Sequence, residues 1–260
     1  MIDPPTKKSL GQHWLHDADS LNAMLDAADI SLDDTVLEIG PGPGTLTEEL
    51  VNAAKEVIAV EFDADLAREL PRRVPADNLA VVNQDILQFD LTSLPPHYKV
   101  VANIPYYLTS NLLRVLCESP NHFSQAAILI QKEVAERVCA GPGDMSLLSV
   151  SVQFYCEARL ERVVPAALFT PPPKVDSQIL ALTFREKPLF PGVDAKAFFR
   201  LVKAGFAQRR KTLLNSLSSG LHLGREETTA LLDAAQIAPS TRAQNLSIDD
   251  WYRLYKCYNT

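Results

Sequence analysis

Six short apolar runs constrain the fold of this chain more than any other feature of the sequence. They lie at residues 36–39, 57–61, 79–83, 98–103, 126–131 and 179–184. Each run is rich in Val, Ile, Leu or Ala and is continuous rather than alternating, which is typical of strands buried on both faces of a parallel sheet. The segments between most of them are long enough for a crossover helix, as at residues 45–52 and 63–72. The pattern predicts an α/β doubly wound sheet.

A change of pattern after residue 184 indicates a domain boundary. Residues 186–194 contain two prolines and a glycine, which is the composition of a linker. From about residue 188 the apolar spacing becomes helical, as in Phe198, Phe199 and Val202. We therefore predict two domains, an α/β domain over residues 1–187 and a small all-helical domain over residues 188–260.

Length and composition narrow the class of protein. A chain of 260 residues that is 47% hydrophobic suits one large domain with a small appendage. No apolar run approaches the length of a membrane span, and the N-terminus lacks the apolar core of a signal peptide. The four cysteines, at positions 117, 139, 156 and 257, show no paired-ligand spacing, so we expect reduced thiols and no zinc site. A cytoplasmic protein without a membrane segment is expected.

The formal charge of −7 is distributed unevenly along the chain. Residues 188–260 carry 10 Lys and Arg against 6 Asp and Glu, a net charge of +4, whereas residues 1–187 carry a net charge of −11. This asymmetry is consistent with a surface that binds an anionic partner. It is equally consistent with a solvent-exposed surface that is biased in charge but binds nothing. Composition alone leaves both interpretations open.

A glycine-rich loop, Glu38-Ile-Gly-Pro-Gly-Pro-Gly44, follows the first apolar run and precedes an expected helix. Gly40, Gly42 and Gly44 let the backbone turn sharply and let a ligand approach closely, although such turns also serve packing alone. Glu61 ends the second run 21 positions after Gly40. That is the usual place for a carboxylate that accepts hydrogen bonds from ribose hydroxyls. A nucleoside-containing cofactor is therefore expected.

The chemistry of this loop favours one class of cofactor. A dinucleotide places its pyrophosphate on backbone N–H groups at a helix N-terminus. Pro41 and Pro43 remove two of those donors. Glu38 is expected to put negative charge at the loop entrance, which is unfavourable beside a pyrophosphate and favourable beside an ammonium or sulfonium group. S-adenosylmethionine therefore fits better than NAD, and an NAD-dependent oxidoreductase is the alternative.

Two further runs end in polar residues. Asp85 follows the third run, where its carboxylate is suited to accept from an adenine amine or, alternatively, to form an Asx turn or helix cap. The fourth run ends in Asn103-Ile-Pro-Tyr106. The Asn103 oxygen and a carbonyl near Pro105 can accept from an exocyclic amine, while Tyr106 offers a ring face for stacking. An ordinary turn at a strand end is the alternative for these four residues alone.

Taken in order, these motifs resemble those of the ribosomal RNA adenine N6-dimethyltransferases, and most closely their bacterial small-subunit (16S) members, the KsgA family. The resemblance covers nearly the whole chain and is also carried by residues 7–15, 131–134, 169–177 and 206–212. Trp14 stands where the family usually has Phe. Residues 144–149 lack a Tyr-Gly pair that is common in relatives, in a loop that by analogy borders the target pocket.

The resemblance implies a Rossmann-like S-adenosylmethionine-dependent methyltransferase domain over residues 1–187 and a helical domain over residues 188–260 that positions the rRNA. The implied reaction dimethylates N6 of two adjacent adenosines in a hairpin near the 3′ end of small-subunit rRNA, in the 30S subunit or its precursor, during ribosome biogenesis. A monomer without a metal is expected.

The resemblance also implies roles for individual residues. Those expected to contact the cofactor are His13, Leu15, Glu38, Gly40, Gly42, Gly44, Glu61, Phe62, Asp85, Ile86 and Asn103. Asn103, Pro105 and Tyr106 are expected to hold the adenine, and Phe169 is expected to close its other face. The residues expected to bind RNA are Lys174 and a basic run that we place on a helix, Arg209, Arg210 and Lys211.

Two alternatives share this fold. One is the large-subunit rRNA adenine N6-methylase of macrolide resistance, and residues 11–12, 169–174 and 208–211 favour the small-subunit enzyme over it. The other is a non-catalytic RNA-binding assembly factor. The complete set of Glu61, Asp85 and Asn103 disfavours a pure binder. Detectable methyl transfer to RNA would distinguish an enzyme from such a binder.

Overall fold

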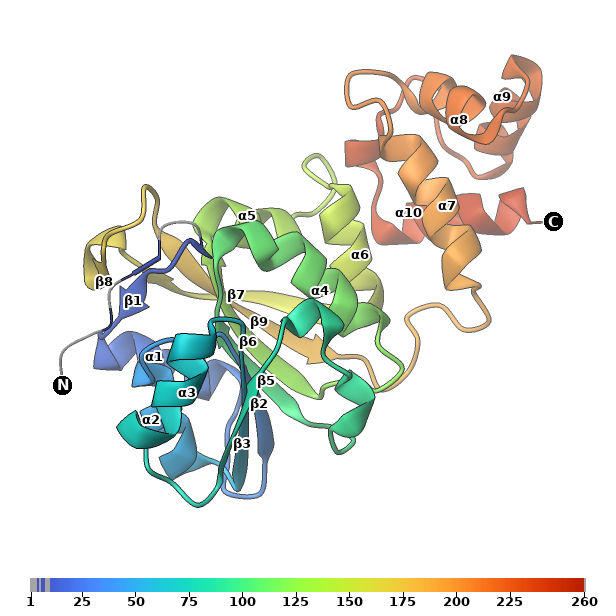
Figure 1. Ribbon diagram of the computed structural model, residues 1–260. Coiled ribbons are helices and arrows are strands. Elements are labelled where there is room, and N and C mark those ends of the chain that lie inside the picture. Colours follow the sequence, from blue (N-terminus) through green and yellow to red (C-terminus); the bar gives the residue numbers. More distant parts are fainter. Residues whose placement is uncertain (1–3, 5, 8–9, 260) are drawn as a thin grey trace. The chain divides into compact units, whose positions relative to one another are not determined.

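The protein, described by a computed structural model over residues 4, 6–7 and 10–259, forms two compact units (Figure 1). The first unit runs to Ala135 and resumes at Cys156–Phe184; the second comprises Glu136–Tyr155 and the chain from Arg185 onward. The sequence boundary at residue 187 assigned residues 136–155 to the first domain, whereas their contacts group them with the helical unit.

The first unit alternates strands and helices. Its strands are β1 (Trp14–Leu15), β2 (Thr35–Ile39), β3 (Glu56–Glu61), β4 (Leu79–Asn83), β5 (Lys99–Asn103), β6 (Gln125–Gln131), β7 (Cys156–Val164), β8 (Phe169–Thr170) and β9 (Ser177–Phe184). Its helices are α1 (Ala18–Ala27), α2 (Thr45–Ala53), α3 (Ala64–Arg73), α4 (Thr109–Glu118) and the start of α5 (Lys132–Val138). Short 3-10 turns include η2 (Ile86–Gln88) and η4 (Tyr106–Leu108).

Seven strands form one sheet in the order β4-β3-β2-β5-β6-β9-β7. All six apolar runs are strands, as predicted, and β4, β3, β2, β5 and β6 are parallel. The expectation of a parallel strand was wrong for the sixth run, because β9 lies antiparallel to both β6 and β7. The connection from β7 to β9 contains no α-helix, whereas parallel neighbours are usually joined by a crossover helix. The result is a mixed sheet with an antiparallel edge.

The sequence pattern missed β7 because that strand is half solvated. Charged residues alternate with apolar ones along it, and Leu160 and Val163 are exposed at the sheet edge. In β2, by contrast, four consecutive residues are buried, so both faces of the sheet centre are covered. One face packs against α1 and α2, where Met24 and Leu50 are fully buried. Each such side chain contributes roughly 1.5–3 kcal/mol of burial free energy.

The second unit is helical. Its helices are α6 (Leu147–Tyr155), α7 (Ala195–Phe206), α8 (Leu213–Leu221), α9 (Arg225–Ala234) and α10 (Ile248–Tyr258). The predicted helical spacing is confirmed, and Phe198, Leu217 and Trp251 form its fully buried centre. Met145, in the loop that departs from the family pattern, is buried in this same core. In the part of the chain that the structure describes, no helix is long and apolar enough to cross a membrane.

Candidate active site

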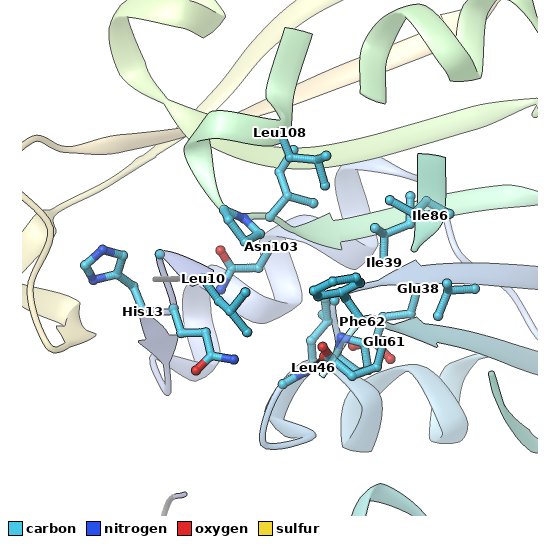
Figure 2. A pocket seen from close by; sticks show the side chains of 18 of the residues that line it. Leu10, His13, Glu38, Ile39, Leu46, Glu61, Phe62, Ile86, Asn103 and Leu108 are labelled. Atoms are coloured by element: carbon cyan, nitrogen blue, oxygen red, sulfur yellow. Dashed lines mark hydrogen bonds between the residues drawn. The ribbon is translucent and has the colours of Figure 1, made fainter. Parts of the chain in front are cut away.

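A cavity of about 190 Å³ lies at the edge of the sheet where β2, β3, β4 and β5 end. Its lining comes from residues 10–15, 38–43, 45–46, 60–62, 84–87 and 103–108, together with Leu21 and Phe169. Figure 2 shows Asn103 in the middle of the pocket, with His13 on one side and Phe62 and Glu61 on the other. The structure thus brings together polar residues from three successive strand ends, as the parallel topology requires.

The backbone donors of the glycine-rich loop are all used within the protein. Gly40 N–H donates to the Val60 carbonyl at 2.9 Å, and Gly44 N–H donates to the Pro41 carbonyl at 3.0 Å. Gly42 N–H donates to Glu61 Oε2 at 3.1 Å. The two prolines between these glycines have no N–H to offer. No backbone donor of residues 40–44 is therefore left for a pyrophosphate, which disfavours a dinucleotide.

Two of the three loop glycines are required by packing. A Cβ atom on Gly42 would lie 2.7 Å from the Trp14 ring, and the φ of this glycine is +58°. A Cβ atom on Gly44, with φ of +98°, would lie 2.9 Å from atoms of Leu70 and Val74. Gly44 does not line the cavity, whereas Gly40 and Gly42 do. Gly40 and Gly42 therefore border the cavity, whereas Gly44 is the N-cap of α2.

Glu61 is buried at the end of β3 with both carboxylate oxygens engaged. Oε1 accepts from Asp63 N–H at 2.8 Å, and Oε2 accepts from Gly42 N–H. Burial raises the pKa of Glu61, and these backbone bonds partly offset the rise. Each oxygen keeps a second lone pair, so the carboxylate can still accept from two ribose hydroxyls. The neighbouring Phe62 ring is 61% exposed and offers a free aromatic face.

Glu38 is fully buried, and its environment differs from the one expected. Desolvation raises the pKa of this carboxyl to about 8, and the nearby charge of Glu61 adds to the rise. Within the described residues, neither Glu38 oxygen has a hydrogen-bond partner. The group is therefore mainly neutral at pH 7, and the expectation of a negative charge at the loop entrance was wrong. The preference against a dinucleotide rests on the saturated loop donors instead.

The cap interpretation of Asp85 is confirmed, and acceptance from an adenine amine stays a prediction. The residue lines the cavity directly after β4. It is also the N-cap of η2, where Oδ1 accepts from Leu87 N–H at 3.0 Å. Ile86, the next residue, is buried and adds an apolar wall. The cap fixes the Asp85 carboxylate beside the apolar Ile86. This arrangement is suited to a purine, whose amine needs an acceptor and whose ring needs an apolar contact.

The Asn103–Tyr106 segment forms the centre of the site. Asn103 ends β5, and Pro105 caps η4 while its carbonyl accepts from Leu108 N–H at 3.0 Å. The Tyr106 hydroxyl lies 2.8 Å from the Ser177 hydroxyl. Phe169 is buried in β8 and lines the same cavity. The four residues expected to hold an adenine therefore border one space.

The N-terminal segment closes one side of the cavity. Its Leu15 is buried in β1 opposite Phe169 of β8. His13 Nδ1 lies 2.6 Å from the Pro171 carbonyl, and because a carbonyl only accepts, Nδ1 carries the proton. Lys7 forms an ion pair with Asp63 at 2.8 Å, beside the Glu61 end of the cavity. Lys8 and Ser9 of the N-terminal motif lie outside the described residues.

The residues expected to bind RNA are exposed and do not line the cavity. Lys174 lies in the loop between β8 and β9 of the first unit. Arg209, Arg210 and Lys211 belong to the second unit, and the expectation of a helix was wrong for them. Helix α7 ends at Phe206, and a turn closed by Lys211 N–H and the Gln208 carbonyl at 2.9 Å follows. Because these three residues lie in a turn and not on a helix, their side chains are not forced to point in different directions around a helix axis.

Several residues of the site carried no recognised signal in the sequence. Leu10, Tyr107 and Leu108 line the cavity, and Ser177 holds the Tyr106 hydroxyl. Leu10 lies in the motif at residues 7–15 and Ser177 in the motif at residues 169–177, and membership of these motifs was the available signal. Over the described ranges, no three His, Cys, Asp or Glu side chains group as metal ligands would.

A glycine-rich loop whose donors are used, and parallel strands that end in Glu61, Asp85 and Asn103 around one cavity, are the site of a Rossmann-like, S-adenosylmethionine-dependent methyltransferase. More narrowly, the chain belongs to the ribosomal RNA adenine dimethylase family, whose model matches residues 5–260.

Similar proteins agree with this assignment. Ribosomal RNA small subunit methyltransferase A of Dehalococcoides mccartyi is 43% identical over 256 residues, which cover 97% of this chain and 88% of the relative. The protein of the same name from Streptococcus thermophilus is 42% identical over 263 residues, covering 95% and 90%.

Two solved structures share the fold over nearly the whole chain. A dimethyladenosine transferase from Plasmodium falciparum has a TM-score of 0.80 at 28% identity, covering 94% of this chain and 97% of that one. The 23S rRNA methyltransferase ErmE has a TM-score of 0.77 at 29% identity, covering 95% and 100%.

Proposed function

We propose that this protein transfers methyl groups from S-adenosylmethionine to N6 of two adjacent adenosines in small-subunit rRNA, and dimethylates each of them. The target hairpin lies near the 3′ end of that rRNA, in the 30S subunit or its precursor. Family membership and the relatives named for the small ribosomal subunit support this substrate. The observation that carries the proposal is the position of Asn103, at a strand end in the same cavity as Glu61.

The cofactor is assigned to the Glu61 side of the cavity. Glu61 accepts from the ribose hydroxyls, while Phe62 and Ile86 provide apolar contact for the adenine and Asp85 accepts from its amine. When bound, S-adenosylmethionine supplies a methyl group on a cationic sulfur. The remaining cofactor contacts are assigned to His13, Leu15, Glu38, Gly40, Gly42 and Asn103, with Gly44 acting through the shape of the loop.

The target adenine is assigned to the Asn103 side. Its N6 lone pair is delocalised into the ring, so the free amine is a poor nucleophile. Acceptors at Asn103 and at the Pro105 region favour a pyramidal amine whose lone pair is available to the methyl group. Alignment and preorganised electrostatics each supply several kcal/mol in such sites. Tyr106 and Phe169 hold the two faces of the base, which offsets the cost of unstacking it, a few kcal/mol.

The proton of the reaction needs no strong base in the protein. The methylated amine is a cation that is acidic enough to lose its proton to solvent, and we therefore propose a reaction without a metal. We also propose that the protein acts as a monomer in the cytoplasm, where its ribosomal substrate assembles. Lys174 and the 209–211 turn are assigned to phosphate contacts, with the helical region from residue 188 positioning the rRNA.

The alternatives are less well supported. The 23S rRNA methyltransferase ErmE shares the fold at 29% identity, whereas the relatives named for the small subunit reach 43%. An NAD-dependent oxidoreductase needs loop donors that are already used. A non-catalytic RNA binder does not require Asn103 beside a buried Glu61.

The test is methylation of small subunits isolated from cells that lack this modification. Wild-type protein should transfer four methyl groups per subunit, and Asn103→Ala should lose far more turnover than RNA affinity, because the Asn103 contact strengthens as the amine pyramidalises. Exposed Asn52→Ala, on α2, is the matched control. Absence of methyl transfer by the wild-type protein would refute the function, and wild-type single-turnover rates in Asn103→Ala would refute the role of Asn103.

A further inference from the structure

We propose that Ser177 is a positioning residue that fixes the Tyr106 ring against the target base, an inference that rests on the proposed function. The two hydroxyl groups lie 2.8 Å apart, although the residues are 71 positions apart in the chain. Ser177 does not line the cavity and so acts only through Tyr106. Nothing in the methyl-transfer chemistry itself requires a serine at this place.

The Ser177 hydroxyl is held rigidly. The residue begins β9, is fully buried, and pairs with Gln131 of β6 on one side and Val164 of β7 on the other. The preceding residue, Asp176, is tied as well, since its carbonyl accepts from Lys132 N–H at 3.0 Å and its side chain accepts from Ala166 N–H at 2.9 Å. A hydroxyl on a strand that is paired on both sides has little freedom to follow a moving partner.

Tyr106 is held less firmly by its own backbone. It begins η4, a single 3-10 turn whose N-cap, Pro105, provides no side-chain hydrogen bond. The ring also stacks on the His13 ring, with centroids 6.1 Å apart and planes 24° apart, but this contact does not fix its hydroxyl. Burial raises the pKa of the Tyr106 hydroxyl, which is therefore protonated at neutral pH and can share a proton with Ser177. The hydrogen bond to Ser177 is the polar contact that holds the Tyr106 hydroxyl in place.

One segment of chain, residues 169–177, supports both proposed walls of the base. Phe169 at its start lies in β8, which is fixed by antiparallel pairing with Leu15 of β1. Ser177 at its end holds Tyr106. The separation of the two rings is thus set by the strands at either end of this segment, and loss of the Ser177 hydroxyl frees one ring while the other stays in place.

The experiment is a double-mutant cycle on single-turnover methylation of unmodified small subunits. Ser177→Ala should slow methylation about three- to tenfold, as expected for loss of one hydrogen bond. Tyr106→Phe, which keeps the ring but not the hydroxyl, should slow it to a similar degree. The double variant should be no slower than either single one, because both changes remove the same contact. Ser177→Cys restores a weaker polar partner and should recover part of the rate.

Two further measurements separate positioning from general damage. An RNA hairpin with 2-aminopurine at the target position should lose fluorescence on binding the wild-type protein, as the base stacks on Tyr106, and lose less of it on binding Ser177→Ala. Cofactor affinity should be unchanged. Ser124→Ala is the control, since its hydroxyl donates to the His97 carbonyl at 2.9 Å at the opposite end of β6; it should leave rate and quenching unchanged.

The outcomes are distinct. If the wild-type protein methylates and Ser177→Ala is equally fast, the positioning role is refuted while the proposed function stands. If the effects of Ser177→Ala and Tyr106→Phe add, or if cofactor affinity falls with the rate, Ser177 is structural only. If the wild-type protein itself transfers no methyl group, the proposed function fails first.

Discussion

The buried carboxyl of Glu38 should make the stability of the protein fall as the pH rises. Its pKa is raised from 4.5 to about 8 in the folded state, chiefly by desolvation. The native state therefore holds this proton more tightly than the unfolded state does. The stabilisation is fully present below pH 4.5 and is lost as the pH rises through about 8. Within that window each pH unit removes up to about 1.4 kcal/mol.

The variant Glu38→Gln isolates this contribution, because an amide of the same shape does not ionise. Between pH 5 and pH 8 the wild-type protein should lose about 3 kcal/mol of unfolding free energy that the variant does not lose. Other titrating groups are common to both proteins and cancel in the comparison. The result would be large against a total stability of roughly 5–15 kcal/mol.

The assay is urea denaturation of both proteins at pH 5, 6, 7 and 8, followed by circular dichroism. Glu48→Gln is the matched control: Glu48 lies exposed on α2, so its neutralisation should leave the pH dependence of stability parallel to that of the wild type. A difference between wild type and Glu38→Gln that stays constant across this pH range would refute the buried, protonated state of Glu38.

Three further outcomes are expected. Glu61→Gln should weaken S-adenosylmethionine binding by about 1–3 kcal/mol in calorimetry, the usual range for a hydrogen bond to a charged group, and unchanged affinity would remove Glu61 from the cofactor site. Replacing Arg209, Arg210 and Lys211 with Gln should weaken rRNA binding and lower its salt slope by about 0.7–0.9 for each lost phosphate contact. Cofactor affinity should stay the same in this variant. An unaltered salt slope would refute phosphate contacts by residues 209–211. Gly42→Ala should lower stability by about 1–3 kcal/mol in thermal unfolding, because its Cβ meets an indole ring.

The sequence alone predicted the elements whose signal is local. Continuous apolar runs identified the six strands buried on both faces, and the helical spacing identified the core of the second unit around Phe198 and Trp251. The glycine loop, Glu61 and Asn103 could be placed at one edge of the sheet, because parallel strands all end on the same side. These inferences need only the period of a strand or helix and the fixed geometry of glycine and proline.

The tertiary structure decided what depends on distant partners. The antiparallel direction of β9, the half-solvated β7 and the pairing of β1 with β8 are set by contacts between residues far apart in the chain. The charge of Glu38 could not be read from its position, since its pKa is governed by the burial that surrounding elements create. The same holds for the Tyr106–Ser177 contact: a hydrogen bond is fixed by distance in space, and the sequence records only distance along the chain.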